Sequence, residues 1–427
     1  MIIKKEVLYK WMLSILLFLP VAVASVEINV VVSLFLFGAV FLDQQNKFSI
    51  SLINSIFPLI LILIIASISS FFYPSTLYDN IKDSFFLLKP VLFILLGYIL
   101  ISKINNKDFI FKVIIYMAVF FAIIHLIEVF IFLLDHPFNV NRIRGETGLS
   151  NDLELFAIVF LIVNKKGKYF SIRLNYSKFI KILLYCSFIL YFSRTMLVAL
   201  FILIFAINGY TKFTRKGVIY IFLFLFLIIM FYMFLNSIDI SSENVGIEGF
   251  LYKIKMAPAE IFYPSNSIDI KDHANLWEHW RAYEALKALE QLVETKYMLG
   301  LFFGKGLGSL VDLGFIAPLN SEGMQFIPKI HNGYINIMFK TGILGLLFYF
   351  IFLSYLYLQS YMKALNIKVL FINNLISGIG IYFAFTTLIV SGIYNQSDIS
   401  AIILGVFLSL KSYYNQNIVY ENSNIRH

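Results

Sequence analysis

The stretch Gly217–Leu235, GVIYIFLFLFLIIMFYMFL, decides the fold of this chain. It contains no charged residue and is long enough to cross the hydrocarbon core of a bilayer as a helix. The longest polar interval of the sequence follows directly, from Asn236 to Asn332, and another apolar stretch begins after it. This junction predicts a polytopic membrane protein with one large loop outside the membrane.

The composition supports a membrane protein. The chain has 427 residues, of which 60% are hydrophobic and 14% are charged, and its mean hydropathy is +0.82. A soluble chain is nearer half apolar and a quarter charged, so lipid must surround many of these side chains. The net charge of +9 does not indicate a nucleic-acid partner, because the basic residues cluster in short loops between apolar segments.

The apolar segments predict an all-α polytopic protein with about twelve transmembrane helices. Their cores are Leu8–Ala24, Ile28–Leu42, Ile53–Phe72, Phe85–Ile101, Phe109–Leu134, Leu153–Val163, Ile180–Phe192, Thr195–Ile207, Gly217–Leu235, Tyr334–Leu358, Val369–Val390 and Ile399–Leu410. The region Ile180–Ile207 fits one long helix or a hairpin turning at Ser193-Arg194, and the hairpin keeps the loop charges consistent. We expect the first helix to be retained, although Ala22-Val23-Ala24 resembles a signal-peptide cleavage site.

The loop charges predict that both termini lie in the cytoplasm. With that orientation the inner loops contain Lys47, Lys103, Lys107, Lys165, Lys166, Lys168, Arg173, Lys178, Lys212, Arg215, Lys216, Lys363 and Lys368. The short outer loops contain only Lys82, Arg142, Arg144 and Arg194. The chain then divides into spans one to nine (1–235), a large outer loop (236–333), and the last three spans with a cytoplasmic tail (334–427).

The large loop carries a candidate amphipathic helix from about Asn275 to Tyr297, followed by Gly300 as a stop signal. Its apolar positions recur at helical spacing: Ala282, Leu286, Leu289 and Val293. The run Gly304-Lys305-Gly306-Leu307-Gly308 lacks the spacing and the Lys-Ser/Thr ending of a phosphate-binding loop. We interpret this run as a tight turn that returns the loop to the membrane.

Four arginines lie on the predicted outer side of the membrane, contrary to the positive-inside rule. They are Arg142, Arg144, Arg194 and Arg281. Guanidinium groups bind phosphate oxygens through bidentate hydrogen bonds, so together they are candidates for holding a diphosphate. The alternatives are contacts with lipid headgroups and salt bridges to the nearby acidic residues Glu146, Asp152 and Glu154.

His331 ends the polar interval and adjoins the next span on the outer side. A histidine at this place can act as a general base, or it can be structural. His125 and Glu128 share one face of the fifth span and form either a functional pair or an interfacial anchor. No metal site is expected, because the spacing of Asp269, Asp272, His273 and His279 matches no known ligand pattern.

A single cysteine is present. Cys186 lies inside an apolar run, where we expect it to be buried. No disulfide can form within the chain.

Four short motifs resemble the superfamily of O-antigen polymerases and O-antigen ligases of Gram-negative inner membranes. They are Arg142-Ile143-Arg144-Gly145 through Leu149-Ser150-Asn151, then Ser193-Arg194-Thr195, then Arg281 with Phe303-Gly304-Lys305-Gly306, and last His331-Asn332 with Gly342 and Gly345. The number of spans and the place of the large loop resemble this family too. Two departures are Lys340-Thr341 before Gly342, where family members often carry an acidic residue, and Asp152, where a proline is often seen.

The resemblance implies a glycosyltransferase that works at the periplasmic face on glycans carried by undecaprenyl diphosphate. It implies that His331 deprotonates the acceptor hydroxyl, which then displaces the diphosphate from the anomeric carbon with inversion. Arg194 and Arg281, with Arg142 or Arg144, would stabilise the leaving diphosphate. The accessory candidates are Asn332, Lys329 and Glu128. The reaction needs no metal and no other cofactor, and the partners are the lipid-linked donor and acceptor, membrane lipids and a chain-length regulator protein.

Within this resemblance a polymerase, which joins lipid-linked repeat units, is preferred to a ligase, which transfers the glycan to lipid A-core. The motifs are degenerate, and polymerases are the more divergent branch. The rival from another class is a flippase for lipid-linked oligosaccharides, which performs no chemistry. The long outer loop argues against such a carrier, since carriers of that kind typically have short loops throughout.

Overall fold

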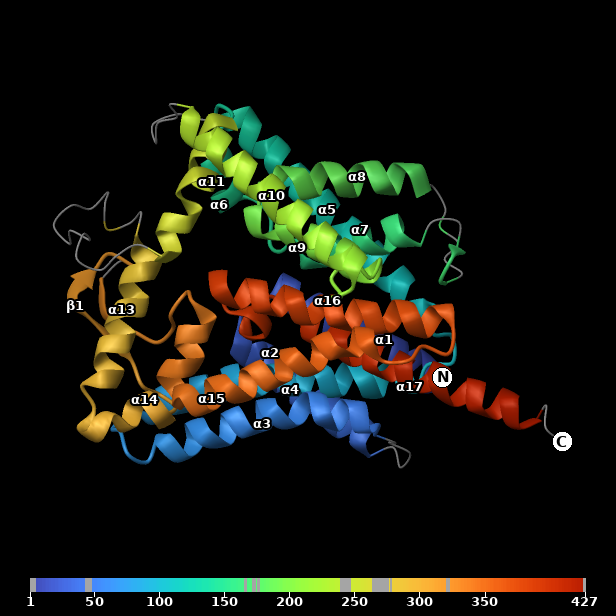
Figure 1. Ribbon diagram of the computed structural model, residues 1–427, viewed down its shortest axis with the longest axis horizontal. Coiled ribbons are helices and arrows are strands. Elements are labelled where there is room, and N and C mark those ends of the chain that lie inside the picture. Colours follow the sequence, from blue (N-terminus) through green and yellow to red (C-terminus); the bar gives the residue numbers. More distant parts are fainter. Residues whose placement is uncertain are drawn as a thin grey trace.

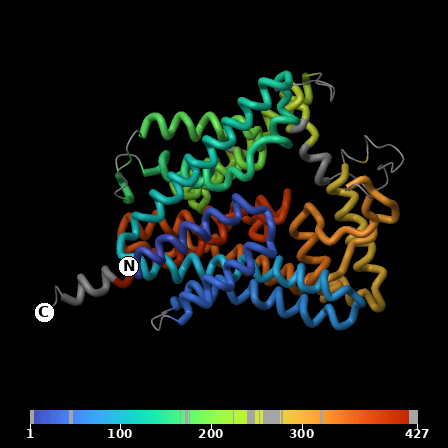
Figure 2. Tube along the Cα trace, turned by 180° about the vertical axis from the view of Figure 1, so that it is seen from behind, coloured from blue at the N-terminus to red at the C-terminus, as the bar shows by residue number. Residues whose placement is uncertain are grey.

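The computed structural model describes residues 5–42, 48–164, 167–170, 174, 177–238, 247–262, 276, 279–319 and 323–424, and it is mostly helical. Figures 1 and 2 show two groups of helices and a compact assembly of short elements at one end of them. The first group is α1–α4 with α15–α17, and the second is α5–α10. The contact between α9 and α16 joins the two groups.

The helices of the two groups cover the predicted apolar segments. They are α1 (Lys5–Ala22), α2 (Val26–Phe41), α3 (Ile50–Ser69), α4 (Leu77–Ser102), α5 (Phe109–Asp135), α6 (Val140–Glu146), α7 (Asp152–Val163), α8 (Ser177–Leu190), α9 (Arg194–Ile207), α10 (Arg215–Ser237), α15 (Gly333–Leu358), α16 (Ile367–Ile389) and α17 (Ser400–Asn424). Every predicted span overlaps one of these helices. The region Ile180–Ile207 is a hairpin, as expected, and Ser193 caps α9 by accepting a hydrogen bond from the backbone of Met196.

Within the described part of the chain, 6 helices are long and apolar enough to cross a membrane. They are Ile50–Ser69, Leu77–Ser102, Phe109–Asp135, Arg215–Ser237, Gly333–Tyr361 and Ile367–Ile389. The apolar helices α2 and α9 are shorter. The side chains of α10 are mostly exposed, whereas those of α4 and α16 are mostly buried. An apolar helix with an exposed surface is expected where lipid is the solvent.

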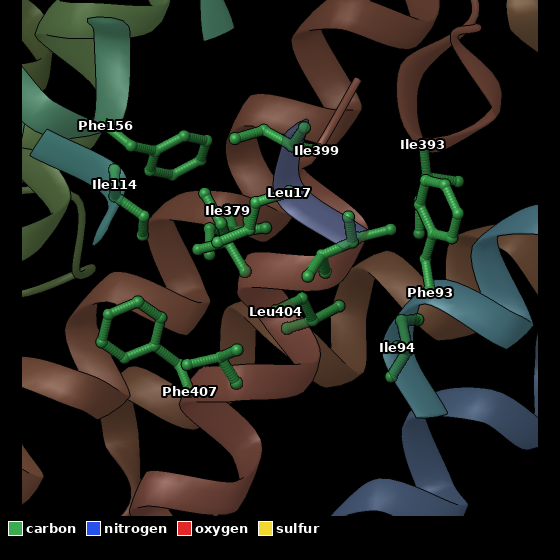
Figure 3. Close-up of a cluster of buried hydrophobic side chains, with 14 of the residues drawn as sticks. Leu17, Phe93, Ile94, Ile114, Phe156, Ile379, Ile393, Ile399, Leu404 and Phe407 are labelled. Atoms are coloured by element: carbon green, nitrogen blue, oxygen red, sulfur yellow. The ribbon is translucent and has the colours of Figure 1, made fainter. Parts of the chain in front are cut away.

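The core of the first group is built around the close crossing of α4 and α17. A Cβ atom on Gly97 would lie 2.3 Å from the carbonyl oxygen of Ile402, and one on Gly405 would lie 2.1 Å from that of Ile94. Glycine at both positions lets the two backbones touch. Figure 3 shows the apolar side chains that pack around this crossing, among them Leu404 and Phe407.

The large loop folds into a cap, which comprises α13 (Trp280–Val293), η3 (Lys296–Met298), α14 (Leu299–Phe303), β1 (Val311–Ala317) and β2 (Met324–Ile327). The two strands are antiparallel and pair Val311 with Ile327. The strands are a finding that the sequence analysis did not predict, as is the helix α11 (Ile247–Phe262), which contacts α6 and α13.

The predicted amphipathic helix is present as α13, but two details of the prediction were wrong. The helix ends at Val293, and Gly300 lies inside α14 rather than stopping it. The buried face carries Tyr283, Glu284 and Ala288, whereas Val293 is 45% exposed. The apolar spacing therefore identified the helix and part of its inner face, since Ala282 is buried and Leu289 packs against the cap cluster, but it missed Tyr283, Glu284 and Ala288.

The end of the helix bundle opposite the cap brings together several chain segments that carry lysines. The start of α1 and the end of α17 lie at the end opposite the cap (Figures 1 and 2). There, Asn105 donates a hydrogen bond to Glu6, and the Lys107 ammonium lies 5.0 Å from the Tyr413 ring. The loop that carries Lys103 and Lys107 is thus at the same end as the start of α1.

The single cysteine differs from its expectation. Cys186 is exposed on α8 rather than buried. An apolar segment whose surroundings are lipid has an outward face, and hydropathy alone does not tell which residues are on it.

Candidate functional site

The imidazole of His331 is paired with a buried carboxylate of the cap. Its Nδ1 atom lies 2.8 Å from Oε2 of Glu284, and the same oxygen accepts a hydrogen bond from the His331 backbone N–H at 3.1 Å. The Glu284 side chain is 2% exposed and that of His331 is 49% exposed. Because a carboxylate accepts hydrogen bonds, Nδ1 donates in this contact, and in the neutral form of the ring the lone pair is then on Nε2.

Glu284 is held in place by the apolar interior of the cap. It projects from the buried face of α13, next to Tyr283, whose hydroxyl donates a hydrogen bond to the carbonyl of Leu313 at 2.6 Å. The neighbouring Ile330 is buried in the same cluster. The carboxylate and the imidazole therefore have little freedom to separate, although they are far apart in the sequence.

Asn332 has a structural role at the start of α15. Its side-chain oxygen accepts hydrogen bonds from the backbone of Tyr334 and Ile335, which makes it the N-cap residue. Asn336 continues the anchoring by accepting from the backbone N–H of Ile330 at 3.3 Å. The cap of α15 thus fixes the backbone on both sides of His331.

Lys329 lies on the other side of His331, against α4. Its ammonium is 4.4 Å from the centre of the Phe86 ring, and its side chain is half-buried. The pKa of Lys329 is lowered to about 8, first by burial and then by the positive charge of Lys82, while Asp83 opposes the shift. A half-buried cation with a lowered pKa, two residues from His331, is a candidate for binding an anion.

The glycine run Gly304–Gly308 is a turn that crosses α15, as the sequence analysis expects. The backbone N–H groups of Lys305 and Gly306 donate to the carbonyls of Phe339 and Lys340, at 2.8 and 3.0 Å. These N–H groups are therefore occupied by backbone and are not directed at a ligand.

The helix α15 is interrupted where this turn crosses it. Gly342 has φ +66°, and a Cβ atom there would lie 2.2 Å from the carbonyl group of Phe302. Just before the break, the ammonium of Lys340 lies 2.6 Å from Oδ2 of Asp83, which also accepts a hydrogen bond from the Gly308 backbone at 2.7 Å. Lys340, two residues before the break, is thus paired with a carboxylate of α4.

The four candidate arginines fall into two places. Arg281 is on α13, one helical turn before Glu284, and so belongs to the same face as the His331 pair. Arg142 and Arg144 are on α6, and Arg194 is the first residue of α9. Apolar contacts among Val129, Ile143 and Phe192 bring α5, α6 and the turn before α9 into one cluster.

Some arginines of the second group, which comprises Arg142, Arg144 and Arg194, already interact with neighbouring side chains. Arg142 forms an exposed ion pair with Glu146 at 2.9 Å, and its guanidinium lies 5.4 Å from the Phe132 ring. Arg144, Arg194 and Arg281 each interact with another group as well.

His125 and Glu128 do not act as a pair. The Nδ1 atom of His125 is 2.9 Å from Oγ of Ser187, which in turn donates to Glu154 at 2.9 Å, and all three side chains are buried. Glu128 instead accepts a hydrogen bond from the backbone N–H of Gly148 at 2.6 Å. Glu128 thereby fixes the loop between α6 and α7, which is a structural role.

Within the described ranges, no group of three or more His, Cys, Asp or Glu residues is placed to hold a metal ion. Three of the residues considered for a metal, Asp269, Asp272 and His273, lie outside those ranges.

The sequence analysis missed Glu284. The residue is separated from His331 by 47 positions, and charged residues in an amphipathic helix are usually solvated. The predicted inner face of α13 included Ala282 and Leu289, which do face the cap interior, but not Glu284, which is buried with them.

The sequence was compared with family models and with curated proteins. No family model matches the chain. No curated protein matches it either.

Proposed function

We propose that this protein is a membrane glycosyltransferase of the O-antigen polymerase type, which joins repeat units carried on undecaprenyl diphosphate. The observation that carries the proposal is the His331–Glu284 pair. A histidine whose Nδ1 is held by a buried carboxylate, and whose ring is half exposed, has the arrangement of a general base. The pair lies in a cap at one end of a bundle of apolar helices, where a lipid-borne substrate arrives.

In the proposed reaction, Nε2 of His331 takes the proton of the acceptor hydroxyl. The hydroxyl oxygen forms a bond to the anomeric carbon as the bond from that carbon to the diphosphate breaks, with inversion. The diphosphate keeps the electron pair, and cations near His331 stabilise its added charge. Arg281 is the candidate arginine nearest to the base along α13, so we assign it to the diphosphate before Arg142, Arg144 or Arg194.

We further propose about twelve spans with both termini in the cytoplasm and the cap in the periplasm of a bacterial inner membrane. Two features support this topology. The start of α1 and the end of α17 lie at the end of the bundle opposite the cap. The lysines of several predicted inner loops, among them Lys103 and Lys107, are at that same end.

The deciding experiment is a lipopolysaccharide gel of a deletion strain, with the lipid-linked glycan pool analysed beside it. Lipid A-core capped by a single repeat unit is the result expected for a polymerase. Bare core with long glycan on undecaprenyl diphosphate identifies a ligase instead. Repeat units that accumulate on the cytoplasmic face identify a flippase, and unchanged long polymer contradicts all three functions.

Complementation of the deletion strain tests the base. The His331→Ala variant should reach the membrane in normal amounts and form no polymer. The matched control is His136→Ala, which removes a histidine of the α5 end that has no part in the pair. Polymer of normal length and amount from His331→Ala would refute the base assignment.

A further inference from the structure

A cluster of charged side chains lies close to His331 in the chain, against α4. It is formed by the first turns of α4, the start of α2 and the segment before α15. Lys329 and Lys82 are its cations, and the charges of Asp83 and Glu27 act on Lys329 as well. The Lys329 ammonium faces the Phe86 ring, and the Lys82 ammonium lies 5.8 Å from the Tyr78 ring.

The carboxylates of this cluster are already engaged. Asp83 binds Lys340 and the backbone of Gly308, and Glu27 accepts a hydrogen bond from the hydroxyl of Ser25 at 2.8 Å. Among the described residues, no carboxylate oxygen lies within 4.0 Å of the ammonium groups of Lys329 and Lys82. Lys329 and Lys82 therefore form no direct ion pair, and the two carboxylates that act on Lys329 have other hydrogen-bond partners.

Such an arrangement costs free energy unless an anion binds. Burial penalises the charged form of Lys329, and the nearby charge of Lys82 adds repulsion. A bound phosphate removes both penalties and gains charge-assisted hydrogen bonds. The cluster is thus arranged for a ligand with at least one, and more favourably two, negative charges.

The surroundings indicate that this anion is attached to a lipid. On the outer surface of α4, Leu77 is 76% exposed and Tyr78 is 70% exposed, next to the turn that carries Lys82. Exposed apolar and tyrosine side chains at the end of a spanning helix are typical of the membrane interface. An anion that enters from this side carries an apolar tail.

The cluster is also close to the base. Lys329 is two residues before His331, whose ring contacts Glu284 of α13, and its ammonium contacts Phe86 of α4. A diphosphate bound at Lys329 would therefore lie near the imidazole that takes the proton of the acceptor.

We infer that Lys329 and Lys82 bind the diphosphate of a polyprenyl-linked glycan and take up the charge of the leaving group. The inference rests on the proposed function and deepens it, because it names two lysines, in addition to Arg281, as ligands of the same substrate. It also assigns the entry side of the lipid, next to α4.

Binding of farnesyl diphosphate to the full-length protein in detergent micelles tests the inference without requiring turnover. We expect Lys329→Ala and Lys82→Ala each to weaken binding by about tenfold or more, as the loss of a charge-assisted hydrogen bond does. Lys329→Arg keeps the charge and should retain binding within a few-fold.

The matched control is Lys287→Ala, which removes a cap lysine that is paired with Glu290 at 2.8 Å. It should leave binding unchanged, and size-exclusion profiles of all variants verify that they are folded. Binding that is indifferent to both Lys329→Ala and Lys82→Ala overturns the inference. So does equal competition by dioleoylphosphatidylglycerol, which would identify the cluster as a phospholipid headgroup site.

Failure of this inference can be told apart from failure of the proposed function. If the deletion strain lacks polymer but both lysine variants bind farnesyl diphosphate normally, the proposed enzyme class is retained and the lysine site is rejected. If binding depends on the lysines but the deletion strain still makes normal polymer, the lysine site is retained and the proposed function is rejected.

Discussion

At the scale of single residues, the contact between Glu284 and His331 has the largest chemical consequence. The carboxylate fixes the tautomer of the ring and favours the imidazolium that forms when Nε2 accepts a proton. Glu284 is a positioning residue in this scheme, since it touches the base rather than the substrate. Its contribution can be measured apart from that of His331.

We expect Glu284→Gln to lower the rate of glycan polymerisation by about 10²-fold, within the range by which general bases contribute. Initial rates on a lipid-linked donor provide the value. Glu290→Gln, on the exposed side of α13, is the control, and an unchanged rate in Glu284→Gln would exclude the positioning role.

The lowered pKa of Lys329 gives the diphosphate site a pH dependence. Below its pKa of about 8 the lysine is charged, and above it the neutral form dominates. Affinity for farnesyl diphosphate should therefore be constant near pH 7 and fall by up to about tenfold per pH unit above pH 8. The Lys329→Arg variant remains charged, so its affinity should not fall above pH 8. An equal fall in the wild type and in Lys329→Arg would show that another group causes it.

At this scale the sequence offered candidates only where the position in the chain is itself informative. His331 was a candidate because it adjoins the start of a span, and Lys329 was named as an accessory candidate. Glu284 was not, because its pairing depends on how α13 is rotated against the cap, and that rotation follows from packing around Tyr283 and Ile330. Long-range pairing of this kind leaves no spacing signal in one sequence.

At the scale of elements, the buried pair of Asp83 and Lys340 joins α4 to α15 beneath the cap. Their side chains are 7% and 4% exposed. Removing one partner of a buried pair leaves a charge without compensation, whereas replacing both often costs little. The pair therefore predicts strong coupling between the two positions.

We expect Asp83→Asn to destabilise the protein by roughly 3–5 kcal/mol, because Lys340 then stays buried without its counter-charge. Adding Lys340→Met should restore most of the loss, while the asparagine still accepts the hydrogen bond from Gly308. Thermal unfolding in detergent, followed by intrinsic fluorescence, measures the cycle. The control is Glu290→Gln, which breaks an exposed ion pair and should change the free energy of unfolding by less than about 1 kcal/mol. If the effects of Asp83→Asn and Lys340→Met on that free energy were additive, the two positions would not be coupled.

The helices were predictable from hydropathy, and other elements were not. Strand β1 has the sequence VDLGFIA, in which Asp312 and Gly314 keep a period-two alternation, but the apolar Ile316 at an exposed position obscures it. The break at Gly342 depends on the backbone of Phe302 meeting α15, which no local pattern reveals. Hydropathy reports what surrounds a segment, and these features depend on contacts between distant segments.

At the scale of the whole molecule, the arrangement of the chain makes a direct prediction about sidedness. The cap lies at one end of the bundle, and the start of α1 lies at the other (Figure 1). The single cysteine, Cys186, is easily replaced, so that one new cysteine at a time can report which side of the membrane it faces. Lys216 and Glu290 are exposed positions at the start of α10 and on the cap.

In a Cys186→Ser background, we expect Glu290→Cys to react with a membrane-impermeant maleimide in intact cells. Lys216→Cys should react only after the inner membrane is permeabilised, because the positive-inside rule places that loop in the cytoplasm. The cysteine-free parent is the control for background labelling. The reverse pattern would invert the topology and place the His331 pair on the cytoplasmic side.

The glycine turn that crosses α15 also constrains the order in which the chain can be assembled. Its backbone binds Ala66, which is synthesised long before it, and Phe339 and Lys340, which are synthesised after it. Chains enter the membrane from the N-terminal end as they leave the ribosome. During synthesis the residues of the cap are therefore complete before α15 is made. The cap can form its contacts with α15 only when that helix emerges from the ribosome. In a nascent chain arrested before Phe339, the cap would be accessible to protease. Extension of the chain past Lys340 would allow the cap to pack on α15 and become protected.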